Sequence, residues 1–153
     1  AAYSELARAG VQVAVIEAGL GGRYDATNVI GSRVQVLTTV GLEHTQWLGP
    51  TLTDIATEKL DVVRPGAALV LGAGLDPEVR TVADRIAQQR GAAIVEAGTD
   101  PGVDVGAPGP YQRRNFALAL AAARTYLGHV DQGAVRAARA SARVMGRGMR
   151  ESS

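Results

Sequence analysis

The 153-residue sequence contains no cysteine and few aromatic residues: four tyrosines, one tryptophan and one phenylalanine. Without cysteine the chain forms neither disulfides nor thiolate metal sites, so any bound metal must use oxygen or imidazole ligands. No apolar run approaches the roughly 20 residues of a membrane-spanning helix. The 16 basic residues nearly balance the 15 acidic ones, which gives no electrostatic case for nucleic acid or a membrane as partner. The 46 % of hydrophobic and 20 % of charged residues are ordinary values for a soluble globular domain.

Two further features are missing from the sequence. The phosphate-binding pattern Gly-x-x-x-x-Gly-Lys-Ser/Thr occurs nowhere in the chain. The sequence begins Ala1-Ala2-Tyr3, without a methionine or the pattern of a signal peptide, and it ends as abruptly at Ser153. We therefore expect a segment of a longer protein.

Apolar, β-branched runs alternate along the chain with helix-like segments. Strands are expected over residues 11–16, 33–40, 67–71 and 92–95. Helices are expected over residues 3–9, 51–63, 77–90, 111–127 and 131–144, and loops over residues 19–28 and 98–110. Strands alternating with helices are typical of a doubly wound parallel sheet, so the sequence predicts a three-layer α/β domain.

The most distinctive segment, residues 15–30, follows the first expected strand. It reads Val-Ile-Glu-Ala-Gly-Leu-Gly-Gly-Arg-Tyr-Asp-Ala-Thr-Asn-Val-Ile. Glu17 would stand at the carboxyl end of the strand, which is the edge where ligands bind in open α/β sheets. The glycines behind it would let the backbone approach a ligand closely. A glycine-rich turn beside a solvated glutamate is the ordinary alternative.

Two more segments carry residues capable of chemistry. Residues 38–45 read Thr-Thr-Val-Gly-Leu-Glu-His-Thr, and the expected helix over residues 51–63 contains Lys59 among acidic neighbours. His44 follows the second expected strand and would share an edge with Glu17, where a carboxylate and an imidazole could hold Mg²⁺ together with water and phosphate. The residues alone equally allow His44 to be a helix cap or a core histidine, and Lys59 to be a solvated charge.

Together these segments resemble the signatures of the folylpolyglutamate and dihydrofolate synthases, which belong to the Mur ligase superfamily. The loop matches the family's Glu, Gly-Leu-Gly-Gly and Asp-Ala-Thr-Asn pattern. The second segment is similar to a strand ending in an acidic residue and histidine, with Glu43 where aspartate is usual. The helix is similar to the family's Glu-Lys helix, with Leu60-Asp61 in place of Ala-Gly. The resemblance covers nearly all of this chain but only about the middle of the parent enzyme.

This resemblance implies roles for individual residues around the loop. Glu17 and His44 match the family's metal ligands, which bind Mg²⁺. Lys59 matches a lysine that is carbamylated in the family, where the new carboxylate helps hold a second Mg²⁺. The positions that touch the pterin substrate in dihydrofolate-synthase members are matched by Tyr24, Asp25 and Ala26.

The carboxyl-terminal part of the chain resembles the family's ATP contacts. Residues 108–122 are similar to the segment in which an asparagine opens an alanine-rich helix, so Asn115 is expected to contact the adenine edge of ATP through its amide. Met145-Gly146-Arg147 stands where relatives carry Pro-Gly-Arg, so Arg147 is a second candidate for ATP binding although Met145 replaces the proline.

The expected domain organisation follows from the same resemblance. Residues 1–144 would form a central ATP-binding domain, like that of Mur ligases and related to P-loop NTPases, truncated so that its phosphate loop is missing. Residues 145–153 would begin the linker to a C-terminal domain. The isolated segment is therefore expected to be inactive.

For the parent protein, the resemblance implies an ATP-dependent amide ligase. ATP would phosphorylate the carboxylate of a pteroate or of a folate's glutamate tail, and the amine of L-glutamate would then attack the acyl phosphate. The partners would be dihydropteroate or folate, L-glutamate and ATP with Mg²⁺, without nucleic acid or membrane. The parent would be cytoplasmic and monomeric.

Two other functions remain open at this stage. One is another Mur-type ligase that adds an amino acid to a cell-wall precursor, although the Gly-Leu-Gly-Gly-Arg-x-Asp-Ala-Thr-Asn loop is the folate branch's version. The other is a non-catalytic nucleotide-binding or scaffold remnant. A glycine-rich Lys-Ser/Thr loop encoded upstream would favour a ligase, and its absence a remnant. The sequence does not specify whether the parent makes dihydrofolate, polyglutamates or both.

Overall fold

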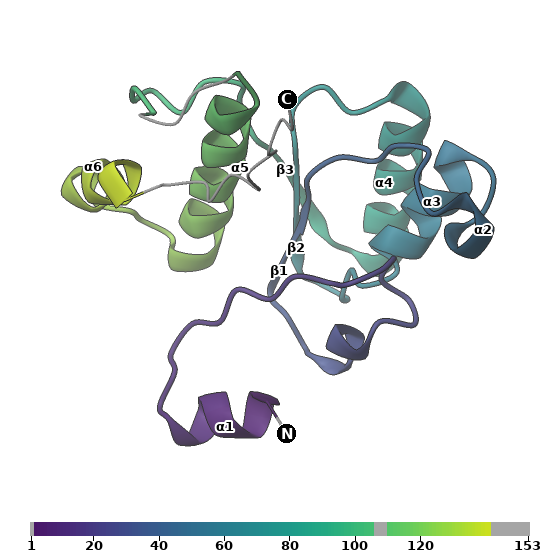
Figure 1. Cartoon of the computed structure of the whole chain (residues 1–153), viewed down its shortest axis with the longest axis horizontal. Helices are drawn as coiled ribbons and strands as arrows, with labels where there is room; N and C mark the ends of the chain where they lie inside the picture. Colours follow the sequence, from purple (N-terminus) through teal and green to yellow (C-terminus); the bar gives the residue numbers. More distant parts are fainter. Residues whose placement is uncertain (1, 106–109, 142–153) are drawn as a thin grey trace, which may run out of the picture.

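A computed structural model describes residues 2–105 and 110–141 (Figure 1). Its strands are β1 (Val34–Leu37), β2 (Ala68–Leu71) and β3 (Ala93–Glu96). Its helices are α1 (Ala2–Arg8), the 3-10 helix η1 (Ala26–Val29), α2 (Thr45–Leu48), α3 (Leu52–Leu60), α4 (Pro77–Arg90), α5 (Pro110–Leu127) and α6 (Gln132–Ser141).

The three strands form one parallel sheet in the order β1-β2-β3. In its register Val34 lies opposite Ala68, and Ala68 lies opposite Ala93. The central strand is apolar throughout, and Leu69, Val70 and Leu71 are almost completely buried. A strand with an unbroken apolar sequence fits a parallel sheet that helices cover on both faces.

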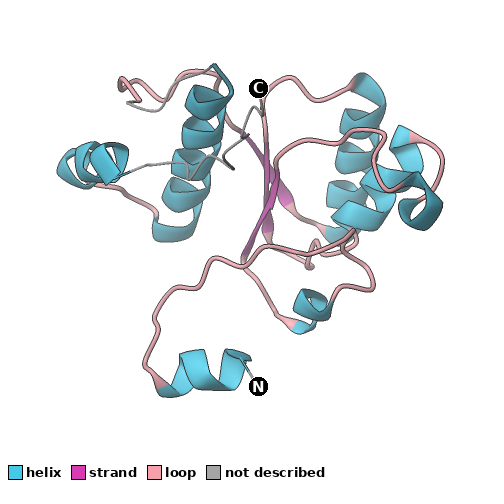
Figure 2. Cartoon of the chain, in the orientation of Figure 1, coloured by secondary structure: helices cyan, strands magenta, loops and turns pink. Residues whose placement is uncertain are grey.

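The sheet is the middle of three layers (Figure 2). On one face, Leu37, Leu69 and Leu71 pack into a core with α3 and α4. On the other face, Val70 packs against Leu118 of α5. Successive strand residues point to opposite faces, so one short strand serves both cores. The predicted three-layer α/β fold is confirmed.

Local sequence signals set the ends of the helices that cover the first face. Thr51 caps α3: its hydroxyl accepts from the Asp54 backbone N–H, and the Asp54 carboxylate accepts from the Thr51 N–H. This reciprocal capping satisfies two donors at the start of the helix. Helix α4 begins with the Asp76 cap and Pro77, and it ends at Gly91, whose φ of 60° is left-handed.

The prediction of a first strand over residues 11–16 is wrong. The segment forms no strand, and Val11, Val13 and Val15 are exposed, Val15 at 96 %. A strand needs a neighbour whose N–H and C=O groups pair with its own. Within the described ranges, β1 to β3 pair only with one another, so an apolar sequence alone does not create a strand here.

Residues 142–153 lie outside the described part of the chain, together with the expected linker 145–153 and the end of the expected helix 131–144. Helix α2, between the second expected strand and α3, was not predicted. None of the helices described is long and apolar enough to cross a membrane.

Candidate ligand site around the glycine-rich loop

Asp25 organises the glycine-rich loop, residues 19–28. One carboxylate oxygen accepts from the backbone N–H groups of Gly19 (2.9 Å) and Leu20 (3.3 Å). The other accepts from the Thr27 hydroxyl (2.5 Å) and the Thr27 backbone N–H (2.8 Å). The Thr27 hydroxyl and these backbone donors lower the pKa of Asp25 to about 2. Asp25 therefore receives four hydrogen bonds from its own loop and shapes it.

The glycines of this loop allow a close approach to α2 and α3. A Cβ added at Gly22 would lie 2.8 Å from the carbonyl oxygens of both Glu58 and Lys59. Gly21 has a φ of 65°, and an added Cβ would lie 2.8 Å from the Leu48 side chain. The sequence attributed the need for glycine to a ligand, whereas here the neighbours are the last turn of α3 and the end of α2.

Arg23 ties the same loop to α3. Its backbone N–H donates to the Glu58 carbonyl oxygen (3.1 Å). Its guanidinium lies 3.3 Å from the Glu58 carboxylate and 3.6 Å from that of Asp61. Glu58 first, and then Asp61, raises the pKa of Arg23 above its ordinary value. The loop and the helix that bears Lys59 thus meet through backbone and side-chain contacts.

Arg64 anchors the end of the loop. Its guanidinium donates to the carbonyl oxygen of Ile30 (3.1 Å) and to the carbonyl and amide oxygens of Asn28. Ala68, at the start of β2, donates to the Arg33 carbonyl beside the start of β1. This end of the loop therefore lies near the amino ends of the strands, not at the carboxyl edge where the sequence placed it.

Lys59 is brought next to the segment that contains His44. Its side chain is 24 % exposed, and its Nζ lies 3.7 Å from Oε1 of Glu43, the residue before His44. His44 is exposed and has a left-handed φ of 53°, directly before α2. The His44 carbonyl accepts from two N–H groups of α2. This geometry directs Lys59 toward Glu43, although Glu58 and Asp61 are nearer in sequence.

Glu17 follows the extended, unpaired segment and is exposed. The sequence argument placed Glu17 and His44 together because each was expected to end a strand of one parallel sheet. That premise fails, since residues 11–16 are not in the sheet. Among the described residues, no three histidine, aspartate or glutamate side chains lie close enough to hold a metal ion by themselves.

The remaining predicted residues occupy separate places. Tyr24 and Ala26 are exposed on the loop and at the start of η1. Asn115 is exposed on α5, which covers the sheet face opposite α3 and α4. The start of α5 is tied to the chain after β3 by the Arg113–Asp100 ion pair (2.7 Å). Arg147 lies outside the described residues.

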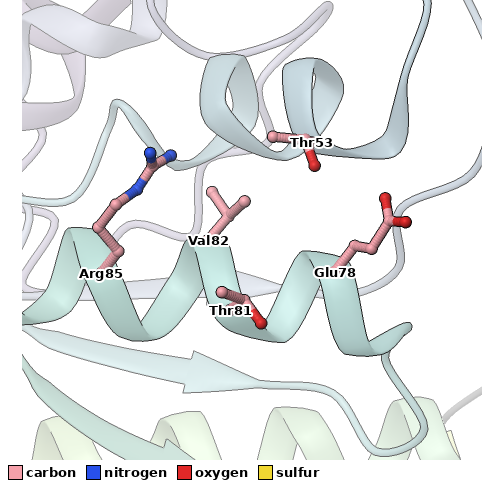
Figure 3. A pocket seen from close by; sticks show the side chains of 5 residues that line it. All are labelled: Thr53, Glu78, Thr81, Val82 and Arg85. Carbon is pink, nitrogen blue, oxygen red and sulfur yellow. The ribbon is translucent and has the colours of Figure 1, made fainter.

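A hollow of about 240 Å³ lies between α3 and α4 (Figure 3). It is lined by Thr53, Glu78, Thr81, Val82 and Arg85. Val82 lies between the charged ends of Arg85 and Glu78, and Thr53 comes from the facing helix. The hollow contains none of the predicted site residues.

Sequence reasoning missed the arginines that hold the loop. Arg64 directly follows the expected helix over residues 51–63, and its partners lie 34 and 36 residues earlier. Arg23 lies in the expected loop, and its partners lie on α3 and just after it. A local sequence pattern does not predict contacts between residues so far apart in the sequence.

The chain is similar to known folate-linked synthases. A dihydrofolate synthase/folylpolyglutamate synthase of Escherichia coli is 37 % identical over 93 residues, which are 61 % of this chain and 21 % of that protein. The mitochondrial folylpolyglutamate synthase of Bos taurus is 36 % identical over 144 residues, 86 % of this chain and 24 % of that protein. The chain therefore spans about a quarter or less of these relatives' length.

Solved structures agree with the sequence relatives. An FPGS–AMPPCP–folate complex (FPGS, folylpolyglutamate synthase) matches 95 % of this chain and 42 % of its own, with a TM-score of 0.88 and 30 % identity. No family model matches the chain. From its relatives and its fold together, the chain belongs to the folylpolyglutamate synthase/dihydrofolate synthase family of ligases.

Proposed function

We propose that this chain is the central, nucleotide-handling part of an ATP-dependent ligase that joins L-glutamate to dihydropteroate or to a folate. The observation that carries this proposal is the packing of the loop, residues 19–28, on the turn of α3 that bears Lys59. That packing occurs in a fold that matches the FPGS–AMPPCP–folate complex with a TM-score of 0.88.

The proposed reaction has two steps. A carboxylate oxygen of the pteroate or folate attacks the γ-phosphorus of ATP. The bond between that phosphorus and the β-phosphate oxygen breaks, so ADP departs and the substrate becomes an acyl phosphate. The α-amine of L-glutamate then attacks the acyl carbon, phosphate departs, and the amine loses a proton as the amide forms. Nearby donors must balance the charge on the transferring phosphoryl group in the first step and on the departing phosphate in the second.

The Glu17 carboxylate is a donor of the kind that Mg²⁺ prefers, although the premise that placed it beside His44 in one sheet fails. Mg²⁺ is commonly held by one or two carboxylates, with phosphate and water completing the shell, so the lack of a three-residue cage among the described residues is compatible with it. Glu17 and His44 are the residues that would hold it, with Lys59 joining them as a carbamate. When bound, the metal would neutralise charge on the phosphates.

Different residues of the chain would contact different parts of the two substrates. Asn115 would read the adenine through its amide, and Arg147 would contact ATP near the C-terminal domain. Tyr24 and Ala26 present exposed surface that could contact the pterin. Asp25 would act on the same substrate by fixing the loop, because its carboxylate oxygens already accept four hydrogen bonds.

The natural-length protein would be a cytoplasmic, monomeric enzyme. Residues 1–144 would be its central domain and residues 145–153 the start of the linker that follows. The names of the relatives favour the folate branch over a ligase of cell-wall precursors, and they include both dihydrofolate and folylpolyglutamate synthases.

The test is an assay of ligation by the natural-length protein. ADP release would be measured with dihydropteroate and, separately, with tetrahydrofolate, each with and without L-glutamate. We expect glutamate-dependent ADP release and a product heavier by one glutamyl residue with at least one of the two substrates. An acyl phosphate would also move ¹⁸O from the substrate carboxylate into phosphate. ATP turnover without any new amide would contradict the proposal.

A further inference from the structure

We propose that Arg23 is a positioning residue that clamps the glycine-rich loop onto the helix turn bearing Lys59 and so fixes the loop relative to that lysine. This inference rests on the proposed function, because it assigns Arg23 a part in that reaction. Its proposed role involves no contact of Arg23 with ATP or folate. It acts through the loop and through α3.

The first support is the spacing of the contacts. Glu58 and Asp61, the two carboxylates that Arg23 binds, stand on either side of Lys59 in the sequence. The Arg23 backbone donates to the carbonyl of Glu58, and Gly22 lies directly over the carbonyls of Glu58 and Lys59. The loop is thus attached to the two residues that frame Lys59.

The clamp also has a fixed base. Arg90, the last residue of α4, lies 3.5 Å from the same Asp61 carboxylate. Helix α4 supplies Val79, Val82 and Ala83 to the core, so Asp61 is bound to a well-packed element. Arg23 therefore connects the loop to the core through Asp61 and Arg90.

Lys59 meets a carboxylate that lies outside the clamp. Glu58 and Asp61 are occupied by Arg23 and Arg90, and Lys59 pairs with Glu43 instead, beside His44. Without Arg23, the loop would lose its ion pairs with Glu58 and Asp61. The loop would then be free to shift relative to the turn that bears Lys59.

Exposed ion pairs contribute little to stability because water and salt screen them. Arg23 is 42 % exposed, so its removal is expected to leave the fold intact. Arg80 provides a matched control, since it is 43 % exposed and also binds two carboxylates, those of Asp84 and Glu96, away from the loop. Comparing variants at Arg23 and Arg80 distinguishes the general effect of losing an ion pair from the effect of losing the position of the loop.

The experiment compares Arg23→Gln, Arg23→Lys and Arg80→Gln in the natural-length protein. Steady-state ligation gives kcat and KM, and hydrogen–deuterium exchange follows the backbone amides of residues 19–28. We expect Arg23→Gln to lower kcat by roughly 10- to 100-fold, with the KM for ATP changed less than threefold and with faster exchange in the loop. Arg23→Lys should recover part of both. Arg80→Gln should match the wild type in kcat and in loop exchange.

Wild-type kcat and unchanged loop exchange in Arg23→Gln would overturn the inference. Slower ligation with unchanged loop exchange would overturn it as well, because the loss would not pass through the loop. If the wild type shows no glutamate-dependent ligation, the proposed function fails, whereas the exchange comparison still tests the clamp. If Arg23→Gln does not fold, Asp61→Asn removes one partner of the clamp and is judged by the same two measurements.

Discussion

Asp25 illustrates at the residue scale how one side chain determines a loop. Its pKa of about 2 lies below the ordinary 3.8, so its contribution to stability is fully present above about pH 4 and is lost as the pH falls toward 2. We expect Asp25→Asn to destabilise the chain by about 1 kcal/mol at pH 7. Urea unfolding at pH 7, 4 and 2.5 measures the difference from wild type, which should shrink with acid. A difference that is the same at all three values would show that the charge of Asp25 is unimportant.

Lys59 carries the sharpest chemical prediction. In the natural-length protein, mass spectrometry in bicarbonate buffer should detect a labile carbamate on this side chain. Lys59→Ala should lower kcat at least 100-fold, on the scale of losing one preorganised charged group, and short carboxylic acids should restore part of it. Glu78→Gln, at an exposed site on α4, is the control. Full activity in Lys59→Ala would remove the residue from the mechanism.

The sequence attributed the glycines of the loop to a ligand, and the structure adds a packing reason for two of them. Gly21 and Gly22 are needed because Leu48 and the carbonyls of α3 approach them. That distance is set by tertiary packing, which a local pattern does not contain. The contact between Lys59 and Glu43 could not be predicted either, because it joins α3 to the segment before α2, a helix that the sequence did not predict. The metal, pterin and ATP roles stay predictions.

At the scale of the element, the predicted bounds are correct where residues with strong backbone preferences mark the ends of a helix. The expected helix over residues 77–90 has the bounds of α4, because Asp76, Pro77 and Gly91 mark its ends by their own backbone preferences. The expected strand over residues 11–16 failed, because pairing depends on a neighbour that no local signal supplies. A short apolar run therefore indicates a tendency to form a strand, and the strand forms only where a neighbouring strand is present to pair with it.

The cap of α3 offers a test at this scale. Thr51 and Asp54 satisfy two donors at the start of the helix, so Thr51→Ala should destabilise the chain by about 1 kcal/mol. Thr53→Ala, in the exposed first turn, should change stability by less than about half of that. Thermal unfolding of the two variants gives the comparison. Equal melting temperatures would mean that α3 is held by its packing and not by its cap.

The whole molecule presents an open sheet. Strands β1 and β3 are its edges among the described residues, and the extended segment 11–16 exposes several apolar side chains. Unpaired edges and exposed apolar segments favour association between copies. The parallel direction of the strands could be predicted from alternating strands and helices. The strand order β1-β2-β3 and the end of the sheet at which each loop lies could not, because they depend on tertiary contacts such as that of Arg64 with Asn28.

The last prediction concerns the 153-residue chain on its own. It should bind Mg-ATP only weakly and should not catalyse ligation. Phosphate sites of this kind draw much of their affinity from backbone N–H groups and a lysine in a glycine-rich loop, and the sequence contains no Gly-x-x-x-x-Gly-Lys-Ser/Thr. Asn115 lies on α5, on the opposite side of the sheet from α3 and Lys59, so the adenine contact would act without phosphate contacts beside it.

Calorimetric titration of this chain with Mg-ATP measures the affinity directly, and the control is the natural-length protein under the same conditions. We expect a dissociation constant above about 100 μM for the chain, because each lost contact of about 1.4 kcal/mol weakens binding tenfold. Micromolar binding by the chain alone, or ADP release that depends on glutamate, would show that its phosphate site lies within these 153 residues. In that event the segments that follow β1 and β2 would be the first place to look, since ligands of open parallel sheets bind at that edge.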